Sequence, residues 1–300
     1  MLTCFDIGGS RIKPGQSAMP GNLAVQPVFE TPPDYPGFVA GLQSAIAPNS
    51  RGVSISIAGV VDPQTGTLHV ANIPAINGKA LARDLQSAFG LPVWIANDAD
   101  CFTLAEAVSG AGAGHSTVFG IILGTGVGGG IVIDCKILSG AGGYSGEWGH
   151  GPVLTTRLSG LGLEIPHFNC GCGLAGCIDT VGGARGIERI YKHIFGFDLA
   201  STAILSDWLM GEPAAQLVIE AWLDLLSGPL ALVLNVVGAS IVPVGGGLSA
   251  VPELIAALDS AVCTKLLRSP QRPLLVPAQH RVEPGLLGAM MLGWQGLSDG

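Results

Sequence analysis

Charge is scarce in this sequence of 300 residues: charged side chains make up 12% and hydrophobic ones 48%. Lys and Arg together number 14 against 22 Asp and Glu, so the net charge is −8. A chain without a basic patch cannot neutralise a phosphate backbone, which argues against a general nucleic-acid binder. An anionic ligand would have to be held by backbone amides or by a metal ion. A surface with few charges also favours self-association, so we expect a homodimer.

A basic leader is missing as well. The N-terminus, MLTCFDIGGS, reaches an Asp-Gly-Gly turn by residue 6, so no signal peptide is expected. Residues 225–252 carry no charge, but Gly228, Pro229, Asn235 and Pro243 interrupt the run. This favours a buried helix followed by a buried strand over a membrane span. Because the seven cysteines are an odd number, we expect reduced thiols in a cytoplasmic protein that has no membrane partner.

The apolar residues predict strands that alternate with helices, the pattern of an α/β fold. Val53, Ile55 and Ile57 recur at period two, as in a strand, and another strand ends at Ala96. Glycine turns predict two hairpins, in LTCFDIGGSRIKPG and in VFGIILGTGVGGGIVID. Helical spacing predicts helices over residues 99–108, 185–195, 202–210, 214–237, 252–267 and 286–294. Further strands are predicted at 241–244 and near Leu274, and the glycine-rich segment 110–115 is the expected hinge.

Three glycine-rich turns each follow an apolar strand: DIGGS at 6–10, LGTGVGGG at 123–130 and PVGGGLS at 243–249. Glycine lets backbone N–H groups approach an anion closely because no Cβ stands in the way. One such turn is usually only a turn. Together, the three indicate a phosphate site.

Three cysteines gather in the segment HFNCGCGLAGCID, as Cys170, Cys172 and Cys177. Three sulfurs and one nitrogen would make a closed tetrahedral zinc site of the structural type. A disulfide pair or simple buried thiols are the alternatives, and His167 is the fourth ligand that local spacing suggests. The remaining cysteines, which lie in apolar runs, are expected to be small core residues. They are Cys4, Cys101, Cys135 and Cys263.

The motifs FDIGGSRI, NDAD, ILGTGVGGGIV, GEWGH, CGCGLAGCID and VGGGLS occur in the order and spacing of the ROK family, which this sequence resembles over nearly its whole length. The resemblance implies a two-lobed actin-like ATPase (ribonuclease H-like) fold with a structural zinc loop in the second lobe. The N-terminal lobe would comprise residues 1–115, completed by a C-terminal helix at 285–300. The second lobe would comprise 116–284, with the zinc loop at 150–179.

The resemblance also implies ATP-dependent phosphorylation of a hexose at its 6-hydroxyl. The segments ANIPAINGKALARDL and GLGLEIPHFNCGCG resemble members that act on N-acetyl-D-glucosamine, which would become N-acetyl-D-glucosamine 6-phosphate. The alternatives are a glucokinase or another hexose or N-acetylmannosamine kinase, a non-catalytic sugar sensor, and a DNA-binding regulator. A regulator would carry a helix-turn-helix domain before the Asp-Gly-Gly turn, and the turn at residue 6 leaves no room for one.

By this resemblance, ATP would be held by the glycine turns, with Asp6 near Mg²⁺ either directly or through water. The alternative for Asp6 is that it caps its turn. Residues expected around the nucleotide and its metal are Asp6, Gly8, Gly9, Ser10, Arg11, Gly124, Thr125, Gly126, Gly128, Gly129, Gly245, Gly246 and Gly247.

Asp98 is the implied general base, which would accept the proton of the sugar hydroxyl. The alternative for this residue is a helix N-cap. Sugar hydroxyls suit carboxylate and amide groups that can pair with neighbouring oxygens. The expected sugar-binding residues are Gly59, Asn72, Asn97, Asp98, Glu147, His150 and Asp179.

The family pattern points to His150, in GEWGH, as the fourth zinc ligand in place of His167, so the expected set is His150, Cys170, Cys172 and Cys177. Two residues depart from the family pattern. Asp100 stands where Asn is usual, and Asp179 stands where Glu is usual. The shorter side chain of Asp179 would retract its carboxylate by about 1.5 Å, the length of one C–C bond.

Overall fold

The computed structural model describes residues 1–268, 270 and 272–299. The chain divides into two compact units. Unit 1 contains Met1–Gly114, Gly130–Ser145 and His280–Gly300, and unit 2 contains His115–Gly129 and Gly146–Gln279. Both units combine strands with helices, so the predicted α/β class is confirmed. Residues 130–145, which we expected in the second lobe, group with unit 1.

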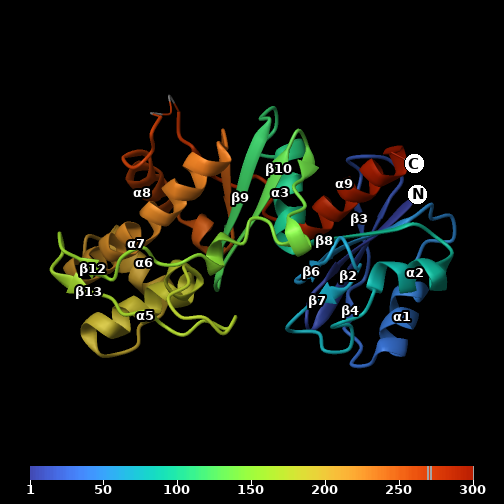
Figure 1. Cartoon of the computed structure of the whole chain (residues 1–300), viewed down its shortest axis with the longest axis horizontal. Coiled ribbons are helices and arrows are strands. Elements are labelled where there is room, and N and C mark those ends of the chain that lie inside the picture. The colour runs from blue at the N-terminus through green and yellow to red at the C-terminus, as the bar shows by residue number, and fades with distance from the viewer. Residues whose placement is uncertain (269, 271, 300) are drawn as a thin grey trace. The chain divides into compact units, whose positions relative to one another are not determined.

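Unit 1 is built on a mixed sheet with strand order β3–β2–β1–β5–β8, in which β4 also pairs with β2 (Figure 1). Its strands are β1 (Leu2–Ile7), β2 (Arg11–Ser17), β3 (Ala24–Val25), β4 (Phe29–Glu30), β5 (Val53–Ile57) and β8 (Val93–Asn97). Strands β1 and β2 pair antiparallel around Gly8 and Gly9, which confirms the first predicted hairpin. Strands β1, β5 and β8 run parallel, so their carboxyl ends bring Gly8, Gly59 and Asp98 toward one edge of the sheet.

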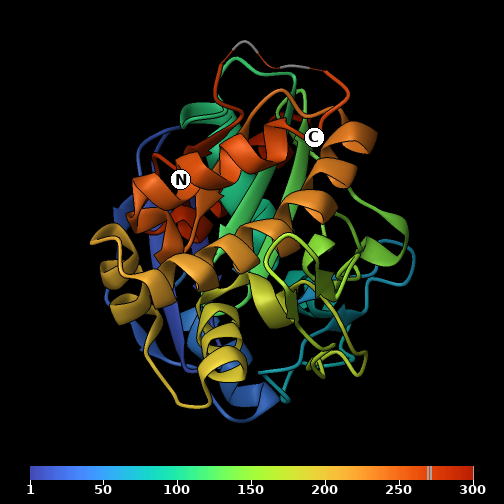
Figure 2. The ribbon, with the colours of Figure 1, turned by 90° about the vertical axis from the view of Figure 1, so that its left-hand side faces the viewer.

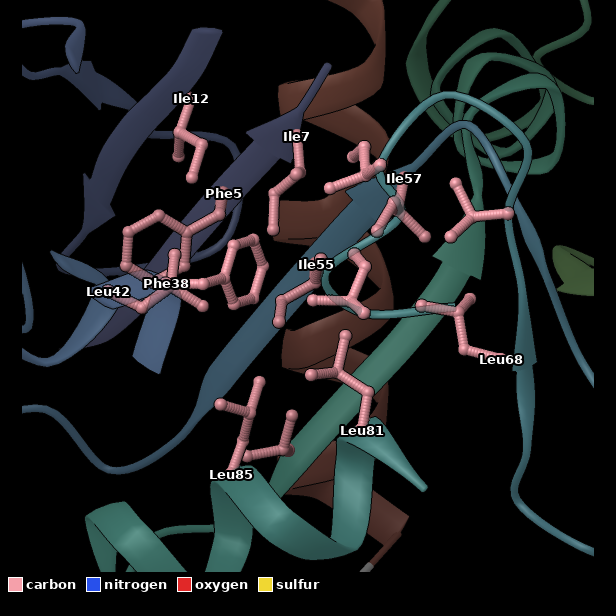
Figure 3. Close-up of a cluster of buried hydrophobic side chains, with 14 of the residues drawn as sticks. Phe5, Ile7, Ile12, Phe38, Leu42, Ile55, Ile57, Leu68, Leu81 and Leu85 are labelled. Carbon is pink, nitrogen blue, oxygen red and sulfur yellow. The ribbon is translucent and has the colours of Figure 1, made fainter. Parts of the chain in front are cut away.

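The two faces of this sheet are covered by different helices. Helices α1 (Tyr35–Ser44) and α2 (Leu81–Phe89) cover one face, and α9 (Pro284–Asp299), with α3 (Asp98–Ser109) against it, covers the other. Figure 3 shows Phe5, Ile7 and Ile55 meeting Phe38 of α1 and Leu81 of α2, all of them buried. The predicted period-two strand is therefore confirmed, with its apolar residues turned toward α1 and α2. The smaller elements of unit 1 are β6 (Val60–Val61), β7 (Leu68–His69), β11 (Lys136–Ile137) and the short 3-10 helix η1 (Ala141–Gly143).

The second sheet has strand order β11–β10–β9–β14–β15, in which β14 runs parallel to both β9 and β15. Its remaining strands are β9 (Thr117–Leu123), β10 (Val127–Ile133), β14 (Val242–Gly245) and β15 (Leu275–Pro277). The strand order confirms the second predicted hairpin, since β9 and β10 are neighbours. The other elements of unit 2 are η2 (Trp148–His150), β12 (Arg157–Leu158), β13 (Leu163–Glu164), α4 (Asp179–Gly182), α5 (Ala184–Phe195), α6 (Ser201–Leu209), α7 (Pro213–Val237), η3 (Gly247–Ala250) and α8 (Pro252–Cys263).

Helix α7 is the central helix of unit 2. It packs against α5, α6 and α8, and Figure 2, in which α7 is orange, shows it among them. It is long and apolar enough to cross a membrane by length and composition, but 61% of its most apolar window is buried inside the protein. Trp222 and Leu226 on this helix are fully buried. The predicted buried helix followed by a buried strand is confirmed, since β14 follows α7 and is buried throughout.

Three expectations need correction. The helix predicted to reach Leu267 ends at Cys263, because the chain turns there and the N–H of Leu267 bonds to the Asn235 side chain instead of continuing the helix. Cys135, expected in the core, is exposed in the turn between β10 and β11, with a φ of +60°. Helices α1 and α2 were not predicted at all, although Asp34 caps α1 and a proline follows in its first turn, both of which are helix-start signals.

The core of unit 1 yields a stability prediction. We expect Ile55→Ala to lower the free energy of unfolding by about 2–5 kcal/mol, because it removes buried methyl and methylene groups and leaves a cavity. The measurement is urea denaturation of the full chain. The control is Val25→Ala on an edge strand, whose side chain is 52% exposed, and which should change stability by less than about 0.5 kcal/mol. Equal losses for the two variants would contradict this account of the core.

Candidate functional site

Asp6 lies near the end of β1, at the carboxyl edge of the unit 1 sheet. Ser56 Oγ donates a hydrogen bond to Asp6 Oδ1 at 2.9 Å, and Lys13 Nζ lies 3.9 Å from Oδ2. Lys13 also pairs with Glu283 at 2.8 Å. Burial raises the pKa of Asp6; the Ser56 hydroxyl and the Lys13 ammonium offset part of this, and the charge of Glu283 adds to it. Such a partly buried carboxylate oxygen is a ligand type suited to a hard cation.

The turn after β1 is exposed and closes on itself. The N–H of Gly8 donates to the carbonyl of Arg11 at 2.9 Å, and Thr31 Oγ1 donates to the carbonyl of Gly8 at 2.8 Å. A Cβ built on Gly9 would lie 3.1 Å from the carbonyl oxygen of Asn72. Gly9, expected near phosphate, and Asn72, expected near the sugar, are therefore neighbours in unit 1. Ser10 and Arg11 are exposed beside them.

Asn97 and Asp98 join the end of β8 to the start of α3. Asn97 Oδ1 accepts the N–H of Ala99 at 2.8 Å, and its Nδ2 donates to the carbonyl of Gly59 at 3.2 Å. The N-cap of α3 is therefore Asn97, and Asp98 is the first residue of the helix. Asp98 Oδ1 also accepts the N–H of Ala99, at 2.9 Å.

A cavity of about 250 Å³ opens beside Asn97, with Val60, Val61 and Asp100 among its lining residues. Asp100, the first departure from the family pattern, is 8% exposed. A larger cavity of about 590 Å³ in the same unit reaches Ser109, at the other end of α3 from Asp98, and contains none of the expected site residues. We therefore take the smaller cavity as the one that belongs to the candidate site.

In unit 2 the second and third glycine motifs lie side by side. The N–H of Gly124 donates to the carbonyl of Gly126 at 3.0 Å, which makes the turn between β9 and β10 tight. Gly246 has a φ of +84°, and a Cβ built there would overlap the backbone of Leu123. Only glycine fits both that conformation and that space. The carbonyl of Gly124 accepts the N–H of Ala184 at the start of α5, at 2.8 Å.

Three cysteines and one histidine converge in the same unit. The ligand atoms of His150, Cys170, Cys172 and Cys177 all lie within 4.8 Å of one another. His150 Nδ1 is 3.7 Å from Cys170 Sγ, and the sulfurs of Cys172 and Cys177 are 3.7 Å apart. His167 is outside this group: it is exposed, and its ring packs over Gly176. The four converging side chains are the set that the family pattern implied.

The backbone explains why they converge. The N–H of Val153 donates to the carbonyl of Gly176 at 2.7 Å, and the N–H of Ile178 donates to the carbonyl of Gly151 at 2.9 Å. The segment that follows His150 is thereby paired antiparallel with the segment around Cys177. The intervening cysteine loop closes through the N–H of Cys170, which donates to the carbonyl of Leu174 at 2.8 Å. For this reason His150 and Cys170, which are 20 positions apart in the sequence, are adjacent in the structure.

The donor set fits a structural zinc ion, since three thiols and one imidazole nitrogen surround one point and all seven cysteines are free of disulfides. In the metal-free chain, Cys172 and Cys177 differ in pKa. The backbone N–H of Leu174 and the neighbouring thiols lower the pKa of Cys172 to about 7, whereas burial and the neighbouring thiols raise the pKa of Cys177 to about 12. A cation would favour the thiolate form of all three.

Glu147 and Asp179 flank this cluster. Glu147 shares the η2 turn with His150, whose N–H donates to the Glu147 carbonyl at 3.0 Å. Burial raises the pKa of Glu147, and nearby His150 lowers it in part. Asp179 Oδ1 accepts the N–H of Val127 at 2.8 Å, and its Oδ2 lies 4.0 Å from Cys170 Sγ. Asp179 therefore links the cysteine cluster to the strand that follows the Gly124–Gly126 turn.

The buried side chain of Trp148 anchors the η2 turn, to which Glu147 and His150 also belong. Its Nε1 donates to the carbonyl of Gly128 at 2.9 Å, and its ring meets Phe119 edge-on, with ring centroids 6.2 Å apart.

The expected residues thus form one group in unit 1, around Gly8, Asn72 and Asp98, and one in unit 2. The sequence analysis missed Lys13, Ser56 and Glu283 beside Asp6. The hairpin register pairs Lys13 with Asp6, so that partner could have been found, whereas Glu283 is 270 residues from Lys13.

Comparisons with known proteins show which family this chain resembles in sequence and in fold. The ROK family model matches residues 28–295. The N-acetyl-D-glucosamine kinase of Escherichia coli O127:H6 (strain E2348/69 / EPEC) is 35% identical over 295 residues, an alignment that covers 96% of this chain and 97% of that protein. The crystal structure of a ROK hexokinase from Thermus thermophilus has a TM-score of 0.82 at 27% identity and covers 100% of this chain and 99% of that one. A ROK family glucokinase from Streptomyces griseus, in complex with glucose and AMPPNP, has a TM-score of 0.73 at 29% identity and covers 98% of this chain and 99% of that one.

The cysteine cluster yields a pH prediction for the metal-free protein. Thiolate is the nucleophile, so Cys172, with a pKa of about 7, should be alkylated increasingly fast between about pH 6 and about pH 8. Cys177, with its pKa raised to about 12, should react far more slowly over this range. The measurement is brief iodoacetamide labelling after chelator treatment, read by mass spectrometry of the peptides. Cys172→Ser is the control for peptide assignment, and faster labelling of Cys177 than of Cys172 would contradict the prediction.

Proposed function

Since this chain belongs to the ROK family and has the fold of its sugar kinases, we propose that it transfers the γ-phosphoryl group of ATP to the 6-hydroxyl of N-acetyl-D-glucosamine. The observation that carries this choice is the 35% identity, over 96% of the chain, to an N-acetyl-D-glucosamine kinase. The products would be N-acetyl-D-glucosamine 6-phosphate and ADP. The actin-like two-lobed organisation, with residues 1–115 and 285–300 forming one lobe and 116–284 the other, is part of the proposal, with the difference that residues 130–145 group with unit 1.

Asp98 is the proposed general base. The sugar 6-oxygen attacks the γ-phosphorus while its proton passes to the Asp98 carboxylate, and the bond from phosphorus to the ADP oxygen breaks. Phosphoryl transfer depends mainly on positioning and charge stabilisation, so a carboxylate of ordinary basicity suffices if it orients the hydroxyl. The position of Asp98 at the first turn of α3, with the N–H of Ala99 donating to Oδ1, supports this role because it directs the carboxylate.

The phosphates would be held by backbone amides, since the chain has only 14 Lys and Arg. The Gly8–Gly9 turn in unit 1 and the Gly124–Gly126 and Gly245–Gly247 turns in unit 2 are the proposed sites of contact. Mg²⁺, bound near Asp6, would neutralise phosphate charge. The hydrogen bond from Ser56 and the nearby Lys13 fix the Asp6 carboxylate, which supports this assignment.

The sugar would be read by hydroxyl-binding groups from both units: Asn72, Asn97 and the Gly59 backbone from unit 1, and Glu147 and His150 from unit 2. Asn97 already holds Gly59 through its Nδ2. Asp179 is the least direct of the proposed contacts, because Val127 occupies one of its oxygens. Its shorter side chain, relative to the glutamate of the family, is consistent with that use.

A structural zinc ion held by His150, Cys170, Cys172 and Cys177 is also proposed. It would supply a fixed tetrahedral crosslink and no step of the reaction. Because His150 Nδ1 faces Cys170, its other ring nitrogen is left for a sugar hydroxyl. We also propose a homodimer, which the sparse charge supports, and a cytoplasmic protein without nucleic-acid or membrane partners, where the net charge of −8 is the argument against nucleic acid. A glucokinase is the second candidate, favoured by the likeness to the Streptomyces griseus glucokinase.

Substrate choice is tested by ADP release with Mg-ATP across hexoses and N-acetylhexosamines. The highest kcat/KM is expected for N-acetyl-D-glucosamine. Asp98→Asn should lower kcat by about 10²–10⁴-fold, because it removes the proton acceptor, and should weaken sugar binding far less in calorimetry, because the amide oxygen can still accept a hydrogen bond from the sugar hydroxyl. No turnover of any sugar would overturn the kinase, and a preference for glucose would overturn only the substrate.

The metal proposal is tested by zinc content. His150→Ala should lose most of the bound zinc and also weaken sugar binding, since the same side chain is proposed to serve both. The matched control is His167→Ala, a nearby exposed histidine outside the cluster, which should keep one zinc ion per chain. The readout is elemental analysis of purified protein beside sugar calorimetry. Stoichiometric zinc in His150→Ala together with loss in His167→Ala would exchange the two assignments.

A further inference from the structure

Glu106, near the end of α3, is a buried acid for which the proposed reaction has no use. Its side chain is 0% exposed. Oε2 accepts the N–H of Ala111 at 2.7 Å, and Oε1 accepts the N–H of His280 at 2.6 Å. A Cβ at position 110 would overlap Oε2 of Glu106, so glycine at this position leaves room for the carboxylate. One carboxylate thus holds two backbone segments that are about 170 residues apart in the sequence.

Both segments adjoin places where the chain passes from one unit to the other. The chain makes four such passages: after Gly114, Gly129, Ser145 and Gln279. Ala111 precedes the first passage by three residues, and His280 is the first residue after the last. The ring of His280 makes a second tie to α3, with Nε2 2.9 Å from Ser109 Oγ. Two of the four passages are therefore held, on their unit 1 side, by the end of α3.

The other end of α3 packs closely against a third passage, without a hydrogen bond of the Glu106 kind among those described. Gly130, the first residue of unit 1 after the second passage, lies against the first turn of the helix, where a Cβ on it would come within 2.8 Å of the Ala99 carbonyl and the Thr103 hydroxyl. Asp98 begins this turn. A single 12-residue helix thus carries the proposed base and contacts three of the four chain passages.

We propose that Glu106 is a positioning residue for phosphoryl transfer. Its carboxylate binds two of the segments through which the chain passes between the units, and thereby holds them against α3, the helix that carries Asp98. This rests on the proposed function. In the proposed reaction Asp98 of unit 1 would act together with the glycine turns and Glu147 of unit 2, so the segments that hold α3 would affect the rate. Misplacement of reacting groups by about 1 Å can cost about 10²-fold in rate.

Glu106→Gln is the informative variant. The amide keeps one acceptor oxygen and offers an NH₂ group in place of the other, so one of the two backbone N–H groups loses its partner. Glu106→Asp, which keeps the carboxylate but is one methylene shorter, is the second variant should the first fail to fold. The matched control is Asp259→Ala. Asp259 Oδ1 accepts the N–H groups of Leu274 and Leu275 at 2.9 Å and 2.8 Å, and Leu275 is also held within unit 2 by its pairing with Val242 of β14.

In amide hydrogen exchange of the full chain without substrates, Glu106→Gln should speed exchange in the peptides that contain residues 111 and 280 by at least about tenfold. The control should speed only those that contain 274 and 275. In the kinase assay, Glu106→Gln should lower kcat by about 10–100-fold while both KM values change less than about threefold. Asp259→Ala should keep kcat within about twofold of the wild type.

Unchanged exchange at residues 111 and 280 would overturn the proposed tie to the backbone. A kcat within twofold of the wild type in Glu106→Gln, or an equal fall in Asp259→Ala, would overturn the positioning role and leave Glu106 as a purely structural residue. Absence of turnover in the wild-type protein would overturn the proposed function instead, and the exchange experiment would still decide whether Glu106 holds the two segments.

Discussion

The antiparallel pairing of residues 151–153 with residues 176–178 is the contact on which the candidate site of unit 2 depends. It brings His150 beside three cysteines that lie 20 to 27 positions further along the chain. It also fixes Ile178, and with it the start of α4, where Asp179 accepts the N–H of Val127. The cysteine cluster, the Glu147 turn and the Gly124–Gly126 turn are therefore held together by a few backbone hydrogen bonds. Loosening this pairing would disturb all three.

Several carboxylates of this chain hold backbone segments in place. Glu106, Asp179 and Asp259 each accept backbone N–H groups, and Asn97 does the same as an N-cap. A carboxylate that accepts N–H groups from two separate segments joins them without needing a cation. Ion pairs play a smaller part: Lys265 with Asp224 and Lys192 with Asp198 are solvent-exposed pairs of the kind that contribute little. Lys13 differs from these because its partners lie at the candidate site.

Local patterns made much of the fold predictable. Period two in residues 53–57, the glycine tips of both hairpins and the apolar run of α7 each predicted an element that the structure contains. Helix α2 was missed because Ala80 gives it no capping side chain. Cys135 was misjudged because apolar neighbours suggest a core strand, whereas its left-handed φ in a two-residue turn is set by the pairing of β10 with β11.

Some residues of the candidate site could likewise be predicted from local sequence patterns, and others could not. Residues within one turn, such as Gly8 with Gly9 or Asn97 with Asp98, could be grouped from sequence because their spacing is local. The choice of His150 over His167 came from the family resemblance, since local spacing favoured the nearer histidine. Glu106 and Glu283 carry no local signal: their partners are about 170 and 270 residues away, and only the folded chain brings them together.

Helix α3 shows why such distant partners matter for function. Eight positions separate Asp98 from Glu106, a rise of about 12 Å along the helix axis. The helix is set at one end by the Asn97 cap and the contact with Gly130, and at the other by the two backbone N–H groups that Glu106 holds. Under the proposed mechanism, the position of Asp98 would therefore depend on the chain passages beside Glu106 as well as on the residues that immediately surround it.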